Sequence, residues 1–159
     1  MNIVIEQLQQ VTPDDIEDLR RLFPQLSSSA SELDPAASTE IVTSPTTTVL
    51  IARAQQKIVG TLTLVVVKIP TGVRARIEDV VVDENHRGSG IGAALTREAL
   101  TRSQQQGART VDLSSHSTRQ AAHRLYLSLG FHIRDSSMYR FQFDDNPLLA
   151  TAAIPPIQN

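Results

Sequence analysis

The chain has 159 residues, of which 15 are Lys or Arg and 17 are Asp or Glu, so its formal net charge is −2. This length is typical of a single domain, and an apolar content of 40% excludes wholesale disorder. The sequence contains no Cys, which excludes disulfides, thiolate nucleophiles and Cys-based zinc sites. Aromatic residues make up only 4%, and the charge balance is slightly acidic. Both features argue against nucleic acid as the main partner.

The sequence also argues against a membrane protein. No run reaches the roughly 18 apolar residues that a membrane-spanning helix needs. Residues 1–6 lack the charged start and the long apolar core of a signal peptide. Together with the absence of Cys, these features predict a cytoplasmic protein with no membrane partner.

The first half of the sequence predicts one long helix and several antiparallel strands. Thr12 can cap a helix that begins at Pro13, with acidic residues near the positive end of the helix dipole. The Ser-, Thr- and Ala-rich stretch 27–45 is expected to be a loop with one short helix within 31–43. Apolar and β-branched runs predict strands over 3–8, 48–54, 58–68 and 74–82. Short connections between the last three favour antiparallel pairing.

The second half predicts a helix, a parallel strand and a further helix. The first of these helices begins at Ile91 and ends at Gly107. A strand over 110–114 follows this crossover helix and should pair in parallel with its neighbour. Residues 117–120 match a capping box for a helix that ends at Gly130. The remaining segments are assigned as two short strands and a flexible tail, over 131–133, 138–143 and 144–159.

The order of these elements predicts an α/β fold with one domain over residues 1–143. We expect a mixed sheet of about six to seven strands, flanked by about four helices. The N-terminal strands should be antiparallel, and the later ones should contain a parallel pair beside a ligand cleft.

Three alternating glycines, Gly88, Gly90 and Gly92, lie where a strand leads into a helix. Glycine lets backbone N–H groups approach a ligand closely, and the first N–H groups of a helix suit a phosphate or pyrophosphate. A plain surface turn is the alternative. The loop lacks the Lys of a nucleotide-binding P-loop. It does fit a degenerate dinucleotide fingerprint ending at Ala93, so a nicotinamide dinucleotide stays an alternative ligand.

Three blocks of the sequence resemble the GCN5-related N-acetyltransferase (GNAT) superfamily. The pattern Arg87-x-x-Gly90-x-Gly92 resembles its acyl-CoA pyrophosphate loop. Residues 77–83 resemble the strand before that loop, and residues 122–131 resemble a later helix with its Ala, Arg, Tyr and terminal Gly-Phe. The resemblance implies an enzyme that moves an acetyl group from acetyl-CoA directly to a primary amine.

By this resemblance, the strand would pair its backbone with the pantetheine arm, and the loop would bind the pyrophosphate. Arg119 stands where many relatives have an Asn that contacts pantetheine, and it could reach a CoA phosphate instead. The implied cofactor-binding residues are Val80, Val81, Val82, Arg87, Gly88, Ser89, Gly90, Ile91, Gly92, Ala93 and Arg119.

The resemblance also implies catalytic residues. Tyr126 matches the family's proton donor to the departing thiolate, although a tyrosine on this helical stripe could equally be a core residue. Glu78 is the candidate base, with a solvated strand carboxylate as the alternative, and His116 is a second candidate for the base. The N–H of Val81 or Val82 would stabilise the oxyanion.

The acceptor amine cannot be identified from the sequence. Acidic residues at 32, 34 and 40 would favour a cationic amine, while Ser114, where N-terminal acetyltransferases often have Glu, weakens a protein N-terminus as substrate. A noncatalytic acyl-CoA sensor is the alternative function, and a homodimer is left open. The three other histidines, His86, His123 and His132, show no metal-ligand spacing, so we expect no metal.

Overall fold

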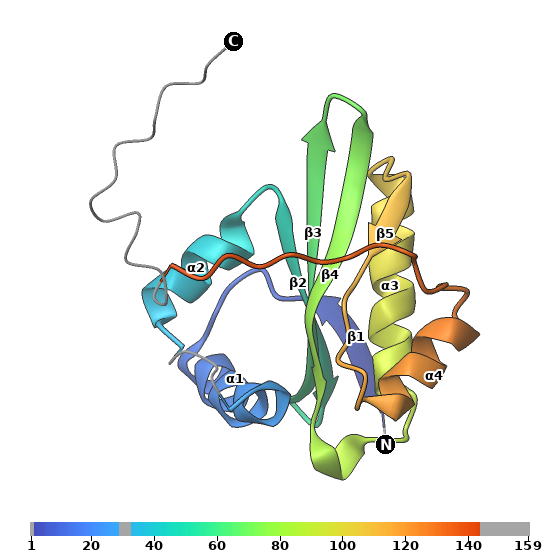
Figure 1. Ribbon diagram of the computed structural model, residues 1–159. Coiled ribbons are helices and arrows are strands. Elements are labelled where there is room, and N and C mark those ends of the chain that lie inside the picture. Colours follow the sequence, from blue (N-terminus) through green and yellow to red (C-terminus); the bar gives the residue numbers. More distant parts are fainter. Residues whose placement is uncertain (1, 29–32, 144–159) are drawn as a thin grey trace.

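The computed structural model describes residues 2–28 and 33–143 (Figure 1). The predicted tail, 144–159, lies outside the described residues, as does part of the predicted loop at 29–32. The elements follow in the order β1 (Ile3–Gln7), α1 (Pro13–Leu26), α2 (Pro35–Thr43), β2 (Thr47–Ala54), β3 (Lys57–Ile69), β4 (Gly72–Val82), a short 3-10 turn η1 (Glu84–His86), α3 (Ile91–Gln105), β5 (Thr110–Asp112) and α4 (Gln120–Ser128).

The strands form one mixed sheet with the order β1-β2-β3-β4-β5. The first four strands are antiparallel to their neighbours, and β5 pairs in parallel with β4. This confirms the predicted mixed sheet, with a parallel pair introduced after the crossover helix α3.

Helices cover both faces of the sheet (Figure 1). On one face, Leu19 and Leu22 of α1 pack with Val42 of α2 against strand residues such as Ile58. On the other face, Leu95 and two further α3 residues pack against a second cluster that includes Leu62 and Ile77. No helix within the described residues is long and apolar enough to cross a membrane.

The predicted start of α1 is confirmed by its hydrogen bonds. The Thr12 side chain accepts from the N–H of Asp15 at 3.2 Å, and Asp15 accepts from the N–H of Thr12 at 2.9 Å, which completes a capping box. Asp34 similarly caps α2, since its carboxylate accepts from Ala36 and Ala37. This acidic residue of the predicted substrate loop therefore has a structural task.

Strand β4 contains a bulge at Asp79. Glu78 lies opposite Thr63 and Val81 opposite Thr61, so two β4 residues face a single β3 residue. Asp79 has φ of 51°, a left-handed conformation that costs energy in a residue other than glycine. As a result, Ile77 and Val80 both pack toward the α3 face, although alternation would place them on opposite faces.

The predicted strands at 131–133 and 138–143 are wrong: the sheet of the described chain has five strands instead of six to seven. A cavity of about 880 Å³ is lined by β5 and by residues of the 131–138 segment, which does not pair with the sheet edge. Its side chains are largely outside the core, with Tyr139 93% exposed. Strand propensity depends on an available neighbour, and here the segment has none.

The predicted capping box at residues 117–120 is also wrong. The residue that caps α4 is Arg119, and its side chain makes no capping hydrogen bond. Instead, Gln120 donates through its side chain to the carbonyl of Ser117 at 2.9 Å. The helix ends near Gly130, which has φ of 91°, as predicted for a C-terminal glycine.

Gly60 gives a test of how closely α3 packs on the sheet. A Cβ at this position would lie 3.0 Å from Cγ2 of Ile91 and 3.4 Å from Cδ1 of Leu95. We expect Gly60→Val to lower the free energy of unfolding by about 1–3 kcal/mol through overpacking, measured by urea denaturation. Thr63→Val, at a partly exposed position of the same strand, is the control and should change it by less than about 0.5 kcal/mol. Equal effects of the two variants would contradict this packing.

Candidate active site

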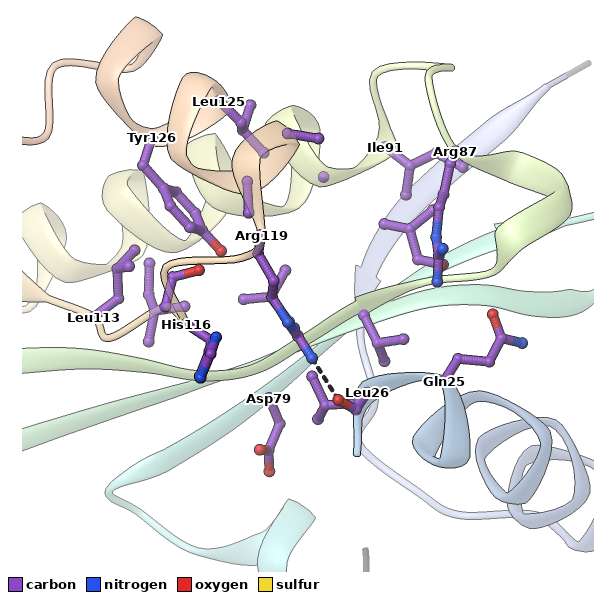
Figure 2. Close-up of a pocket in the computed structure, with 18 of the residues that line it drawn as sticks. Gln25, Leu26, Asp79, Arg87, Ile91, Leu113, His116, Arg119, Leu125 and Tyr126 are labelled. Carbon is purple, nitrogen blue, oxygen red and sulfur yellow. Dashed lines mark hydrogen bonds between the residues drawn. The ribbon is translucent and has the colours of Figure 1, made fainter. Parts of the chain in front are cut away.

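A cavity of about 1030 Å³ opens where β4 and β5 separate. The two strands pair only from Arg74–Thr110 to Arg76–Asp112. Beyond Arg76, β4 continues to Val82 with one edge facing the cavity instead of β5. Figure 2 shows side chains from α1, β4, the following loop and α4 converging on this space.

The three valines predicted to contact a cofactor lie along the open part of β4. Val80, Val81 and Val82 all line the cavity. Val81 is 4% exposed because its side chain packs in the core beneath α1, whereas Val80 and Val82 pack toward α3. Their side chains hold the strand in the sheet, so the ligand-facing groups at this edge belong to the backbone.

The glycine loop, defined here as residues 87–93, brings the N-terminus of α3 to the cavity. Gly88 and Gly90 have φ of 76° and 83°, a backbone conformation that favours glycine. A Cβ at either position would meet nothing within 4 Å, so this conformation, and not a lack of space, explains the glycines. Gly92 differs because a Cβ there would lie 3.2 Å from Cδ2 of Leu125 on α4. The first N–H groups of α3 thus face the cavity, where they suit an anion.

The other loop residues contribute unequally. Ile91 and Ala93 line the cavity, and Ile91 is 2% exposed because it anchors α3 in the core. Ser89 lies outside the cavity lining, and its hydroxyl donates to the carbonyl of His86. The Nε of Arg87 donates to the carbonyl of Val82 at 3.2 Å, which directs this exposed guanidinium along the end of β4.

Arg119 reaches across the cavity from the start of α4. Its guanidinium donates to the carbonyl of Leu26, the last residue of α1 (Figure 2). Within the described residues, neither Arg87 nor Arg119 forms an ion pair with a carboxylate. The cavity therefore carries two guanidinium groups available to an anionic ligand.

Tyr126 lies in the inner wall of the cavity and is 9% exposed. Its ring contacts Phe131 edge to face, with the ring centres 5.7 Å apart. Burial raises the pKa of the Tyr126 phenol above its usual value of 10.0, and the charge of Arg119 partly opposes this effect. The phenol therefore stays protonated at neutral pH and can donate a proton.

The two candidate bases also line the cavity. Glu78 forms an ion pair with Arg76, whose Nη2 also donates to the hydroxyl of Ser114 at 3.1 Å. His116 is exposed at the cavity rim, with its Nδ1 2.9 Å from the hydroxyl of Thr118. Both candidates thus line the same cavity as Tyr126.

Sequence reasoning missed two contributions to this cavity. In a regular strand Glu78 and Asp79 would point to opposite faces of the sheet, but the bulge brings both to the cavity. Gln25 and Leu26 also line it, because the last turn of α1 reaches the end of β4. Their spacing from the glycine loop carries no sequence signal, since tertiary packing alone brings them together.

Within residues 2–28 and 33–143, no group of three or more His, Asp or Glu side chains is placed to bind a metal ion. The identified side chains are instead suited to hydrogen bonding, proton transfer and anion binding.

Asp79 supplies a test of the electrostatics of the bulge. Burial, and then the charge of Glu78, raise the pKa of the Asp79 carboxyl above 3.8. The folded state therefore binds this proton more tightly than the unfolded state, so the stability contributed by the group is full below pH 3.8 and is lost as the pH rises through the folded pKa.

We expect Asp79→Asn to raise the melting temperature at pH 7, because Asn tolerates the left-handed conformation and carries no charge. The difference from the unaltered chain should shrink as the pH falls toward 3.8. Thermal unfolding of both proteins at several pH values measures this, and a difference that grows on acidification would contradict the assignment.

Comparisons with known proteins agree with this architecture. The profile of the Acetyltransferase (GNAT) family matches residues 13–131. N-acetyltransferase 8B of Homo sapiens is 35% identical over 91 residues, which are 56% of this chain and 40% of that protein. N-acetyltransferase 8F1 of Rattus norvegicus is 34% identical over 83 residues, or 51% of this chain and 38% of that protein. The chain thus spans less than half the length of these curated relatives.

Solved structures extend the likeness to the whole fold. A putative acetyltransferase from Agrobacterium tumefaciens str. C58 matches with a TM-score of 0.77 and 27% identity, over 87% of this chain and 99% of that chain. AAC(6′)-Iy, solved with the bisubstrate analogue CoA-S-monomethyl-acetylneamine, matches with a TM-score of 0.73 over 89% of this chain and 99% of that chain. At 16% identity this second likeness shows the fold alone. Because the family profile spans α1 to the end of α4, with β4 and the glycine loop between them, the chain belongs to the Acetyltransferase (GNAT) family.

Proposed function

We propose that this chain transfers an acetyl group from acetyl-CoA directly to a primary amine of a small molecule or peptide. The observation that carries the proposal is the open edge of β4, which leads into a glycine loop and the N-terminus of α3 within one cavity. We assign this activity to one domain over residues 1–143. We expect it to act in the cytoplasm, with a homodimer left open and no nucleic acid or membrane partner.

The proposed cofactor site uses mainly backbone groups. Residues 80–82 would pair with the amide-bearing pantetheine arm, and the N–H groups of residues 88–93 would bind the pyrophosphate. Arg87 and Arg119 would add positive charge near the phosphates. In support, these residues apart from Ser89 line one cavity. The CoA-containing analogue named for AAC(6′)-Iy is further support, since that protein shares the fold.

The proposed reaction proceeds within a ternary complex of protein, acetyl-CoA and amine. The neutral amine nitrogen attacks the thioester carbonyl, and an N–H of Val81 or Val82 stabilises the oxyanion. When the C–S bond breaks, the electron pair leaves on the CoA sulfur, the phenol of Tyr126 donates a proton to it, and the resulting phenolate takes up the proton that the acylated nitrogen loses. The sequence contains no Cys, so an acetyl-cysteine intermediate is excluded.

The attacking amine must lose a proton, because an alkyl ammonium has a pKa near 10. We propose Glu78 as the acceptor of this proton, directly or through water, and His116 as the alternative. Glu78 is favoured because Arg76 holds its carboxylate at the cavity. Asp79 lies beside it with no cationic partner among the described residues, so it adds negative charge that would attract an ammonium group.

A noncatalytic acyl-CoA sensor is the alternative function. An assay of acetyl-CoA turnover with a panel of primary amines, measured as release of the CoA thiol, distinguishes the enzyme from the sensor. We expect at least one amine to release CoA faster than the background hydrolysis. Tight CoA binding with no thiol release on any amine would support the sensor, while binding of NAD in place of CoA would contradict both.

Tyr126→Phe tests the proton donor. The ring and its contact with Phe131 are retained, so CoA affinity should stay nearly unchanged. Loss of the phenolic proton should lower kcat by about ten- to a thousandfold. Gly90→Asp is the contrasting variant, since added bulk and negative charge at the loop should abolish CoA binding. An unchanged kcat in Tyr126→Phe would remove this residue from the mechanism.

A further inference from the structure

We propose that Arg21 and Gln25 of α1 are positioning residues for the glycine loop, acting through Asp83 and Glu84 at its entry. The inference rests on the proposed function, in which the loop binds the pyrophosphate of CoA. Neither residue belongs to the predicted site, and Arg21 lies outside the cavity lining.

Asp83 determines how the chain leaves β4 and enters the loop. It is 3% exposed, and its Oδ1 accepts from the backbone N–H of Asn85 at 2.9 Å and from the Asn85 side chain at 3.2 Å. Its own carbonyl accepts from the N–H of His86 at 2.8 Å. These bonds build the η1 turn, and Arg87 follows directly, so the orientation of Asp83 sets the direction of the glycine loop.

Arg21 fixes the other oxygen of this carboxylate. Its Nη1 donates to Oδ2 of Asp83, and its Nη2 donates to the carbonyl of Ile58 on β3 at 2.8 Å. The same Nη2 lies 3.7 Å from Oδ1 of Asp18, a second buried carboxylate. Because the guanidinium is a rigid fork, these contacts hold Asp83 at a defined place relative to both α1 and β3.

Gln25 makes the second contact one helical turn later. Residues four apart lie on the same face of a helix, and the Oε1 of Gln25 accepts from the N–H of Glu84 at 2.9 Å. The α1 helix thus holds two consecutive residues at the loop entry. The far end of the loop is held separately by Ile91, which is buried in the core.

The glycine loop is therefore held at both ends: at its entry by the α1 contacts with Asp83 and Glu84, and at its far end by Ile91. Loss of the α1 anchor would leave the far end in place but release the entry, so the backbone N–H groups would no longer converge on the pyrophosphate before binding. Preorganised groups bind more tightly because no ordering is needed on binding. The open edge of β4, which would contact pantetheine, is held separately, because β4 pairs with β3 as far as Val82 and the N–H of Asp83 donates to the carbonyl of Val59 at 2.9 Å.

Loss of the α1 contacts should therefore weaken binding of the phosphates of CoA but not of its pantetheine arm. We would measure the affinity of the full chain and of Arg21→Gln for CoA by calorimetry, and for pantetheine, which lacks all the phosphates, by competition. We expect Arg21→Gln to weaken CoA binding by about 10- to 100-fold, as for loss of a charge-assisted hydrogen bond. Pantetheine affinity should stay within about threefold. Arg21→Lys should recover part of the lost CoA affinity, since it keeps the charge beside Asp83.

Two further variants complete the design. Gln25→Ala removes an exposed contact and threatens folding less, so it decides the question if Arg21→Gln does not fold; we expect about 3- to 10-fold weaker CoA binding. Arg20→Gln is the matched control, because Arg20 donates to the carbonyl of Leu33 and should leave CoA affinity unchanged. Failure of the unaltered chain to bind CoA would overturn the proposed function. Normal CoA binding by Gln25→Ala and Arg21→Gln, or equal losses for CoA and pantetheine, would overturn this inference alone.

Discussion

Strands β4 and β5 pair over three residues in parallel, and the candidate site exists because this pairing stops after Arg76 and Asp112. A sheet that continued to pair would satisfy the edge of β4 with β5 and leave no cleft. The bulge at Asp79 turns β4 just beyond the last pair. The strand then ends beside the N-terminus of α3, so an extended ligand would meet strand-like backbone groups first and helix-terminal groups second.

Local signals in the sequence, together with the resemblance to the GNAT superfamily, predicted much of this site. The alternating glycines imply positive φ angles, and Gly88 and Gly90 adopt them. Tyr126 lies on the inward stripe of a helix whose period can be counted from the sequence, and it is buried at the cavity wall. The Thr12 cap followed from a similarly local pattern. Each of these features depends on residues that are close together in the chain, whereas the mixed sheet was predicted from the order of the elements.

Features that depend on distant partners could not be predicted. Residues 138–143 have the alternation of a strand, but the neighbouring segment lines a cavity with β5 and does not pair with its edge. Strand formation requires a neighbour, and no property of the segment itself reveals whether one is present. The contact between Arg21 and Asp83 joins positions 62 residues apart. Arg119 and Leu26 meet in the same way, across the full width of the cavity.

The bulge at Asp79 also determines which face of the sheet each of the next three residues serves. Side chains of a strand alternate, so removing one residue exchanges the faces of all those that follow. Here the exchanged residues would be Val80, Val81 and Val82, three identical side chains, so valine would still face both cores, with one valine in place of two toward α3 and two in place of one toward α1. The hydrophobic pattern of these three residues therefore distinguishes the two alternations by only one valine in each core. The alternation observed is set by the bulge at Asp79 and Val80, in which Asp79 adopts a backbone conformation that is itself unfavourable.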